Sequence, residues 1–270
     1  MIKAGVVEMA IIYIGTSGYS FKDWKGNFYP EDIKNNEMLS FYANHFQIVE
    51  INSTYYAIPN PRSFENMLKN TSDDFLFTVK ANSGMTHERT ENASIFEQFE
   101  HAIKPLVDAN RMKGILFQFP GSFRNNKDNR AYLSQFKDML PQYPLIVEFR
   151  HSSWIAEPVF DYLRELDISY CVVDEPNLPG LVPSKVASTN SLGYVRFHGR
   201  NAKTWWEGDS SQRYNYFYTE QELKDWIPKI KQLADATKET YLFFNNCHAG
   251  FAAKNAITMQ GMIESDLFGH

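Results

Sequence analysis

Nine ionisable or amide side chains occur near the ends of apolar, strand-like segments, and their types suit acid–base and anion chemistry. They are Glu50, Lys80, Gln118, Glu148, Arg150, Asp174, Arg196, His198 and Asn245. Side chains alternate between the two faces of a strand, so Glu148 and Arg150 share one face, as do Arg196 and His198. Carboxylates and imidazole transfer protons, while guanidinium and ammonium groups bind phosphate or carboxylate. The pattern therefore predicts a site that holds an anion and moves protons.

Each of these residues has an expected role. We expect the catalytic groups to be His198 with Glu50, Glu148 or Asp174, because imidazole titrates near neutral pH and a carboxylate can orient it. The expected substrate-binding residues are Lys80, Arg150, Arg196, Gln118, Asn245, Trp154 and Tyr19. The substrate class that fits is a small anionic molecule, phosphorylated or nucleotide-like, and the reaction class is that of a hydrolase or lyase.

A structural role for the same charges is the competing interpretation. Glu50 with Lys80, and Glu148 with Arg150, would then be ion pairs that plug the interior, since a buried charge needs a partner. Replacing buried pairs with apolar residues is often neutral or stabilising, so stability alone does not account for the whole set. We therefore favour a site.

The segments that must position these residues alternate between strand and helix. Strand patterns occur at 11–14, 48–52, 75–80, 114–120, from 145, and at 170–174, 194–199 and 241–246. Helical spacing occurs at 34–46, from 61, and at 94–108, 127–140, 156–166, 219–235 and 252–263. The fold class predicted is α/β, a single parallel (β/α)8 TIM-type barrel over residues 1–270, with 1–10 as an N-terminal extension. A doubly wound open sheet is less favoured, because its glycine-rich fingerprint is missing.

Composition limits the partners. The chain has 270 residues, a net charge of -5 and a pI near 5.8, which disfavours a broad basic surface for nucleic acid. Cys171 and Cys247 are far apart and show no Cys-x-x-Cys spacing, as expected of a reduced cytoplasmic protein. No segment has the length of a membrane span. We expect no membrane partner, and cofactor and oligomeric state stay open.

Several short motifs together resemble the YecE-like family of unknown function. They are Gly15-Thr16-Ser17-Gly18-Tyr19, Trp24, Phe28-Tyr29-Pro30, Glu148-Phe149-Arg150-His151-Ser152-Ser153-Trp154, Tyr194-Val195-Arg196-Phe197-His198-Gly199 and Phe244-Asn245-Asn246. The resemblance runs from about Ile12 to about Met262. It implies a TIM-type barrel and a bacterial or archaeal cytoplasmic protein. It implies no activity, cofactor or catalytic residue.

Three other functions fit parts of the pattern. A glycoside-cleaving enzyme would use Glu50 and Glu148 as its carboxylate pair, with Trp24, Trp154 or Trp205 stacking on sugar rings. A metal site would take His198, Glu50, Glu148 and Asp174 as ligands, although the histidines show no metal-ligand spacing. A non-catalytic module would bind a nucleic-acid strand or a protein through the aromatic loop 200–218, with Trp205, Trp206 and Arg200. We rank all three below the enzyme for an anionic substrate, and the loop aromatics better fit a lid or an oligomer interface.

Overall fold

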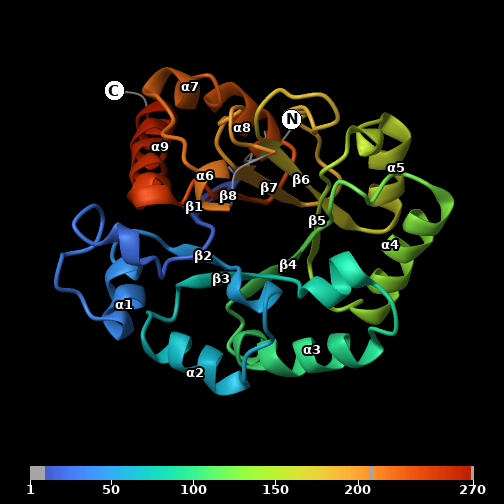
Figure 1. The fold of residues 1–270 in the computed structure, drawn as a ribbon, viewed down its shortest axis with the longest axis horizontal. Helices are drawn as coiled ribbons and strands as arrows, with labels where there is room; N and C mark the ends of the chain where they lie inside the picture. Colours follow the sequence, from blue (N-terminus) through green and yellow to red (C-terminus); the bar gives the residue numbers. More distant parts are fainter. Residues whose placement is uncertain (1–9, 207–209, 269–270) are drawn as a thin grey trace, which may run out of the picture.

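A computed structural model describes residues 10–206 and 210–268 and contains one sheet of eight parallel strands (Figure 1). The strands are β1 (Ile11–Thr16), β2 (Ile48–Ile51), β3 (Leu76–Lys80), β4 (Met112–Gln118), β5 (Leu145–Glu148), β6 (Ile168–Asp174), β7 (Leu192–Phe197) and β8 (Glu239–Phe244). Their order is β1-β8-β7-β6-β5-β4-β3-β2, so the first and last strands are neighbours. The predicted TIM-type barrel is confirmed. The expected N-terminal extension lies outside the described residues apart from Ala10.

The barrel closes between β1 and β2 through very few backbone contacts. One bridge, Ser17 to Glu50, joins the two strands, and the Gly18 N–H donates to the Glu50 carbonyl at 2.8 Å. The hydroxyl of Tyr42 lies in the gap, where it accepts from the Thr16 N–H at 2.9 Å and donates to the β2 backbone at 3.1 Å. The β2 carbonyl that accepts from Tyr42 is that of Ile48. It also lies so close to Gly15 that a Cβ on Gly15 would be 2.2 Å from its oxygen. A side chain at the seam thus replaces part of a strand ladder.

Helices surround the sheet on most sides (Figure 1). They are α1 (Met38–Ala43), α2 (Pro61–Lys69), α3 (Ala93–Asp108), α4 (Lys127–Met139), α5 (Glu157–Glu165), α6 (Ser210–Arg213), α7 (Glu220–Lys224), α8 (Ile227–Ala234) and α9 (Phe251–Phe268). Between β6 and β7 a loop takes the place of a helix. The single helix expected over 219–235 is two helices, because Pro228 lies in the first turn of α8, where its missing N–H costs nothing.

The core lies between the sheet and its helices. Aromatic side chains fill it: Phe117 stacks on Phe136 at 4.3 Å between ring centroids, and Phe149 stacks on Trp154 at 4.3 Å. Phe117 on β4 and Phe149 directly after β5 point outward, toward the helices. The alternate residues of these two segments therefore point into the barrel. In the described part of the chain, no helix has both the length and the apolar character needed to span a bilayer.

Candidate active site

A buried ion-pair cluster fills the barrel beneath the C-terminal ends of its strands. The guanidinium of Arg196 on β7 lies between two carboxylates, with Nη2 2.7 Å from Glu50 Oε1 and Nη1 2.6 Å from Glu148 Oε2. The hydroxyl of Tyr194 donates to the other oxygen of Glu50 at 2.6 Å. All four side chains are buried. The cluster therefore joins β2, β5 and β7 across the interior.

Arg150 extends this cluster toward solvent. Its Nε lies 2.5 Å from Glu148 Oε1, and its Nη1 donates to Glu175 Oε2 at 3.0 Å. Glu175 also accepts from the Val182 N–H at 3.0 Å, which fixes the carboxylate. Burial would raise the pKa of Glu148, but the guanidiniums of Arg150 and Arg196 hold it well below its ordinary value. Burial raises the pKa of Glu175 to about 7 despite the lowering effect of Arg150.

His198 stays neutral in this environment. Its Nε2 lies 3.1 Å from both Glu148 Oε1 and Arg150 Nη2, and its Nδ1 lies 2.9 Å from the amide nitrogen of Asn245. Burial and then the positive charge of Arg150 lower the pKa of His198 to about 3, against the raising effect of Glu148. The expectation that this imidazole titrates near neutral pH is therefore wrong. His198 orients Glu148 instead.

Lys80 on β3 is the amine at the barrel mouth. Its Nζ donates to Gln118 Oε1 at 2.9 Å and lies 4.4 Å from the centroid of the Tyr55 ring. Burial and then the charge of Arg196 lower the pKa of Lys80 to about 7. At neutral pH a large fraction of this amine is therefore unprotonated.

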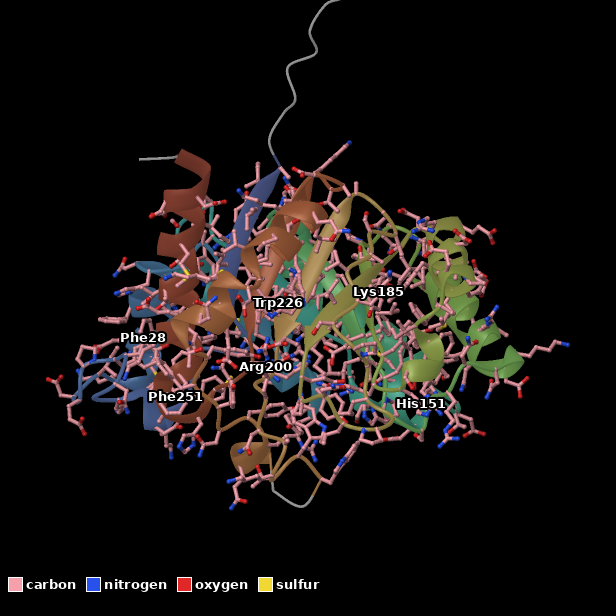
Figure 2. All side chains as sticks on the ribbon, turned by 90° about the horizontal axis from the view of Figure 1, so that it is seen from above. Phe28, His151, Lys185, Arg200, Trp226 and Phe251 are labelled. Carbon is pink, nitrogen blue, oxygen red and sulfur yellow. The ribbon has the colours of Figure 1, made fainter. Side chains whose placement is uncertain are left out.

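Two cavities open above the cluster, at the end of the barrel where Figure 2 places the labelled Arg200 and His151. The first, of about 370 Å³, is called the cationic cavity here; Lys80, Arg150 and Arg213 line it, and none of its described lining residues is an Asp or Glu. The second, of about 410 Å³, is called the polar cavity. Its wall includes Ser17, Asp23, Asn52, Asn245 and His248.

Two tyrosines, Tyr56 and Tyr214, belong to the walls of both cavities. The ring of Tyr214 lies 6.0 Å from that of His198, above the ion-pair cluster. The mouth is therefore two lobes with a shared aromatic border, one lobe positive and one largely uncharged. A larger hollow of about 750 Å³ lies among α7, α8 and α9, but its described lining includes no buried ionisable side chain, so the mouth is the stronger candidate.

The structure brings most of the predicted residues to one end of the barrel. Lys80, Gln118 and Arg150 line the cationic cavity, and Asn245 lines the polar cavity. Below them lie the buried residues Glu50, Glu148, Arg196 and His198. Of the two expected ion pairs, the one between Glu148 and Arg150 is present. The other is not, because Glu50 pairs with Arg196 and leaves Lys80 to Gln118.

Three predicted residues lie elsewhere. Asp174 points out of the barrel and pairs with Arg200 at 3.0 Å. Trp154 is fully buried on the helix side of β5, where its indole N–H donates to the Phe123 carbonyl at 2.6 Å, so it has no surface for a substrate. Tyr19 packs on the ring of Tyr42 at 6.2 Å and lines neither mouth cavity. The expected roles of these three side chains are corrected accordingly.

Several residues at the mouth were not predicted, among them Arg213 of the cationic cavity, Glu175 and Tyr214. Glu175 follows β6, and Cys171 of that strand lies 4.0 Å from Glu148 Oε2, so it faces inward. Counting in twos from Cys171 gives Glu175 as an inward residue and Asp174 as an outward one, which is a signal in the sequence. Tyr214 has no such signal, because the loop that carries it has no strand periodicity.

The geometry also bears on the alternative functions. Glu50 and Glu148 both pair with Arg196 and line neither cavity, so they do not form the open carboxylate pair of a glycosidase. The described residues include no group of three or more His, Cys, Asp or Glu placed to hold a metal ion. In the loop 200–218, Trp205 is 2% exposed and Trp206 is 63% exposed. Of these two tryptophans, Trp206 is the one presented to solvent as a stacking surface.

Comparisons with known proteins agree with this fold. A family described as "Protein of unknown function DUF72" matches residues 13–268. UPF0759 protein YunF of Bacillus subtilis is 34% identical over 276 residues, which cover 96% of this chain and 97% of that protein. UPF0759 protein YecE of Escherichia coli K12 is 29% identical over 150 residues, 54% of this chain and 51% of that protein.

A solved structure extends the likeness to three dimensions. The crystal structure of a DUF72 family protein from Thermotoga maritima superposes with a TM-score of 0.88 at 44% identity, covering 94% of this chain and 99% of that chain. The described barrel is therefore the fold of a close structural relative along nearly its whole length.

Proposed function

The chain belongs to the DUF72 family of proteins of unknown function, and since no activity comes with that membership, we propose from the site's geometry that it is an enzyme acting on a small anionic molecule. The resemblance to the YecE-like family is confirmed by the relatives described above. The proposed binding site is the mouth of the barrel, where enzymes of this fold place their chemistry.

The observation that carries the proposal is the charge of the cationic cavity. Lys80, Arg150 and Arg213 line it, with no acidic residue among the described lining. Arg150 is held in place by Glu148 through Nε, by Glu175 through Nη1 and by His198 through Nη2, and the second N–H of each Nη is left for a ligand. A guanidinium fixed in this way is preorganised for the two oxygens of a phosphate or carboxylate.

The cavity walls indicate what accompanies the anionic group. Tyr55, Trp206 and Tyr214 line the cationic cavity and offer ring faces, and the neighbouring polar cavity offers the amides of Asn52 and Asn245. A molecule with a phosphate or carboxylate at one end and an uncharged polar or aromatic body fits the two lobes. These walls support the phosphorylated or nucleotide-like class.

The experiment is a binding titration with inorganic phosphate, pyrophosphate and AMP, by calorimetry and thermal shift. We expect Arg150→Met to weaken binding about 10- to 100-fold, since a charge-assisted hydrogen bond contributes about 1.5–3 kcal/mol. Arg200→Met is the matched control. Arg200 pairs with Asp174 outside the barrel, so the variant protein should bind the anions as the wild type does. Circular dichroism would establish that both variants fold.

A second variant protects the test against misfolding. Lys80→Gln removes a cavity cation whose only described polar side-chain partner is the neutral amide of Gln118, so no carboxylate loses its partner. It should also weaken binding. Undiminished binding in both Lys80→Gln and Arg150→Met, or no binding of any of the three anions to the wild type, would contradict the proposal.

A further inference from the structure

Lys80 lacks the carboxylate partner that three arginines near the mouth have. Arg150, Arg196 and Arg200 each form an ion pair. Within the described ranges, Lys80 forms none, and its Nζ contacts the amide oxygen of Gln118 at 2.9 Å and the face of the Tyr55 ring. The amine is thus held at the wall of the cationic cavity by neutral groups.

We propose that Lys80 is the nucleophile of the site and forms an imine with the carbonyl group of a small anionic aldehyde or ketone. This inference rests on the proposed function and narrows its substrate class. The anionic group would lie against Arg150 and Arg213, which line the same cavity, and the carbonyl carbon against Nζ.

The chemical state of the amine supports this role. A lysine becomes a nucleophile when burial or a nearby cation disfavours its ammonium form. Both act on Lys80, since burial and then the charge of Arg196 lower its pKa to about 7. An arginine would bind an anion better but has no free electron pair at neutral pH, so a lysine in this position offers chemistry that arginine lacks.

The other nucleophiles near the mouth are poorer candidates. Burial raises the pKa of the Cys171 thiol well above its ordinary value, and it raises that of Cys247 as well, so neither is a thiolate at neutral pH. The hydroxyl of Ser17 accepts from Arg196 Nη2 at 3.3 Å, and a donor there opposes activation of the oxygen. Compared with these thiols and this hydroxyl, the amine of Lys80 is the better nucleophile.

The proposed step balances without a cofactor. The electron pair of Nζ forms a bond to the carbonyl carbon, and the C=O π pair moves to oxygen, which takes up a proton as the nitrogen loses one. A second proton on that oxygen lets water leave as the nitrogen pair forms C=N. The protonated imine then draws electrons from an adjacent bond, which is the use of such lysines in lyases. Hydrolysis of the imine restores the amine.

The test uses pyridoxal 5′-phosphate, which carries an aldehyde and a phosphate, followed by borohydride reduction and peptide mapping. We expect Lys80 to be labelled at least about tenfold faster than Lys113 at pH 7.5, because an ordinary lysine with a pKa near 10.4 is almost fully protonated there. Lys113 is the matched control, half-buried at the other end of the barrel and paired with Glu239. The labelling rate should rise with pH and reach half its maximum near pH 7.

Two further arms separate the inference from the proposed function. Lys80→Arg should abolish the adduct and keep phosphate binding. Equal labelling of Lys80 and Lys113 would refute imine formation by Lys80. If phosphate binding still depended on Arg150, the proposal of an anionic substrate would be retained. Equally fast labelling of Lys80 by pyridoxal, which has no phosphate, would support the amine and count against the anionic substrate.

Discussion

Arg196→Met should destabilise the protein more than any surface charge change. The guanidinium is about 2% exposed and makes hydrogen bonds of 2.7 and 2.6 Å to Glu50 and Glu148, whose side chains are fully buried. Two charge-assisted bonds at about 1.5–3 kcal/mol each set the scale, and breaking a buried pair typically costs about 3–5 kcal/mol because a carboxylate is left uncompensated. We expect a loss of about 3–5 kcal/mol in the free energy of unfolding at pH 7.5.

The loss should depend on pH in one direction. With Arg196 gone, Glu50 keeps no cationic partner among the described residues, and an unpaired buried carboxyl is neutralised by taking up a proton. Lowering the pH from 7.5 to 5 should therefore shrink the deficit. In the wild type the pKa of Glu148 lies well below its ordinary value, so its stabilising contribution is complete above about pH 5 and is lost only in stronger acid.

The assay is urea unfolding followed by tryptophan fluorescence at both pH values. Arg164→Met is the matched control, since Arg164 also joins two carboxylates, Glu157 at 3.1 Å and Asp161 at 2.6 Å, but its side chain is 42% exposed. An exposed pair contributes about 0–1 kcal/mol, so this variant should lose little at either pH. Comparable losses in the two variants, or a deficit in Arg196→Met that does not change with pH, would refute the reasoning.

Three other predictions follow from single contacts. Gly15→Ala should cost about 2–3 kcal/mol, because its Cβ would lie 2.2 Å from the Ile48 carbonyl; Gly261→Ala, with open space around it, should not destabilise the protein, and equal urea midpoints for the two would contradict the clash. Tyr42→Phe should cost about 1–3 kcal/mol in the same assay, since it leaves backbone groups of β1 and β2 without their hydroxyl partner, and an unchanged midpoint would show that water replaces it. Asp174→Asn should change the affinity for phosphate, measured by calorimetry, by no more than about twofold, because the side chain faces away from the mouth. A tenfold loss of affinity would show that Asp174 contributes to the binding site.

The fold was predictable because strand and helix differ in period. The strands were found from runs of β-branched and aromatic residues, and their polar last residues indicated the end that carries the site. The same period explains one failure: Asp174 and Glu175 are adjacent acids at the end of β6, and only the inward position of Cys171 distinguishes them. Asp174 was expected at the site because it is the last residue of the strand, whereas Glu175 is the acid on the inward face.

The ion pairs and protonation states of the side chains were less predictable from the sequence than the ends of the strands on which they lie. Which carboxylate pairs with which cation depends on the register of strands far apart in sequence, as when Arg196 reaches Glu50 on β2. The neutrality of His198 depends on its full burial beside Arg150, which no local pattern encodes. Trp154 was assigned to substrate because tryptophan after a strand suits stacking, whereas a turn of backbone carries it to the outer core.

The way the barrel closes has a consequence for how the protein is made. All six residues of β1 pair with β8, from Ile11 with Glu239 to Thr16 with Phe244, whereas β1 and β2 are joined by little more than one bridge and the hydroxyl of Tyr42 on α1. During synthesis the first strand therefore leaves the ribosome without its main partner and waits until the last strand has been translated. At about 5–20 residues per second that wait is roughly 10–45 s. The barrel can therefore close only after β8 has been translated, whatever the early strands have formed by then.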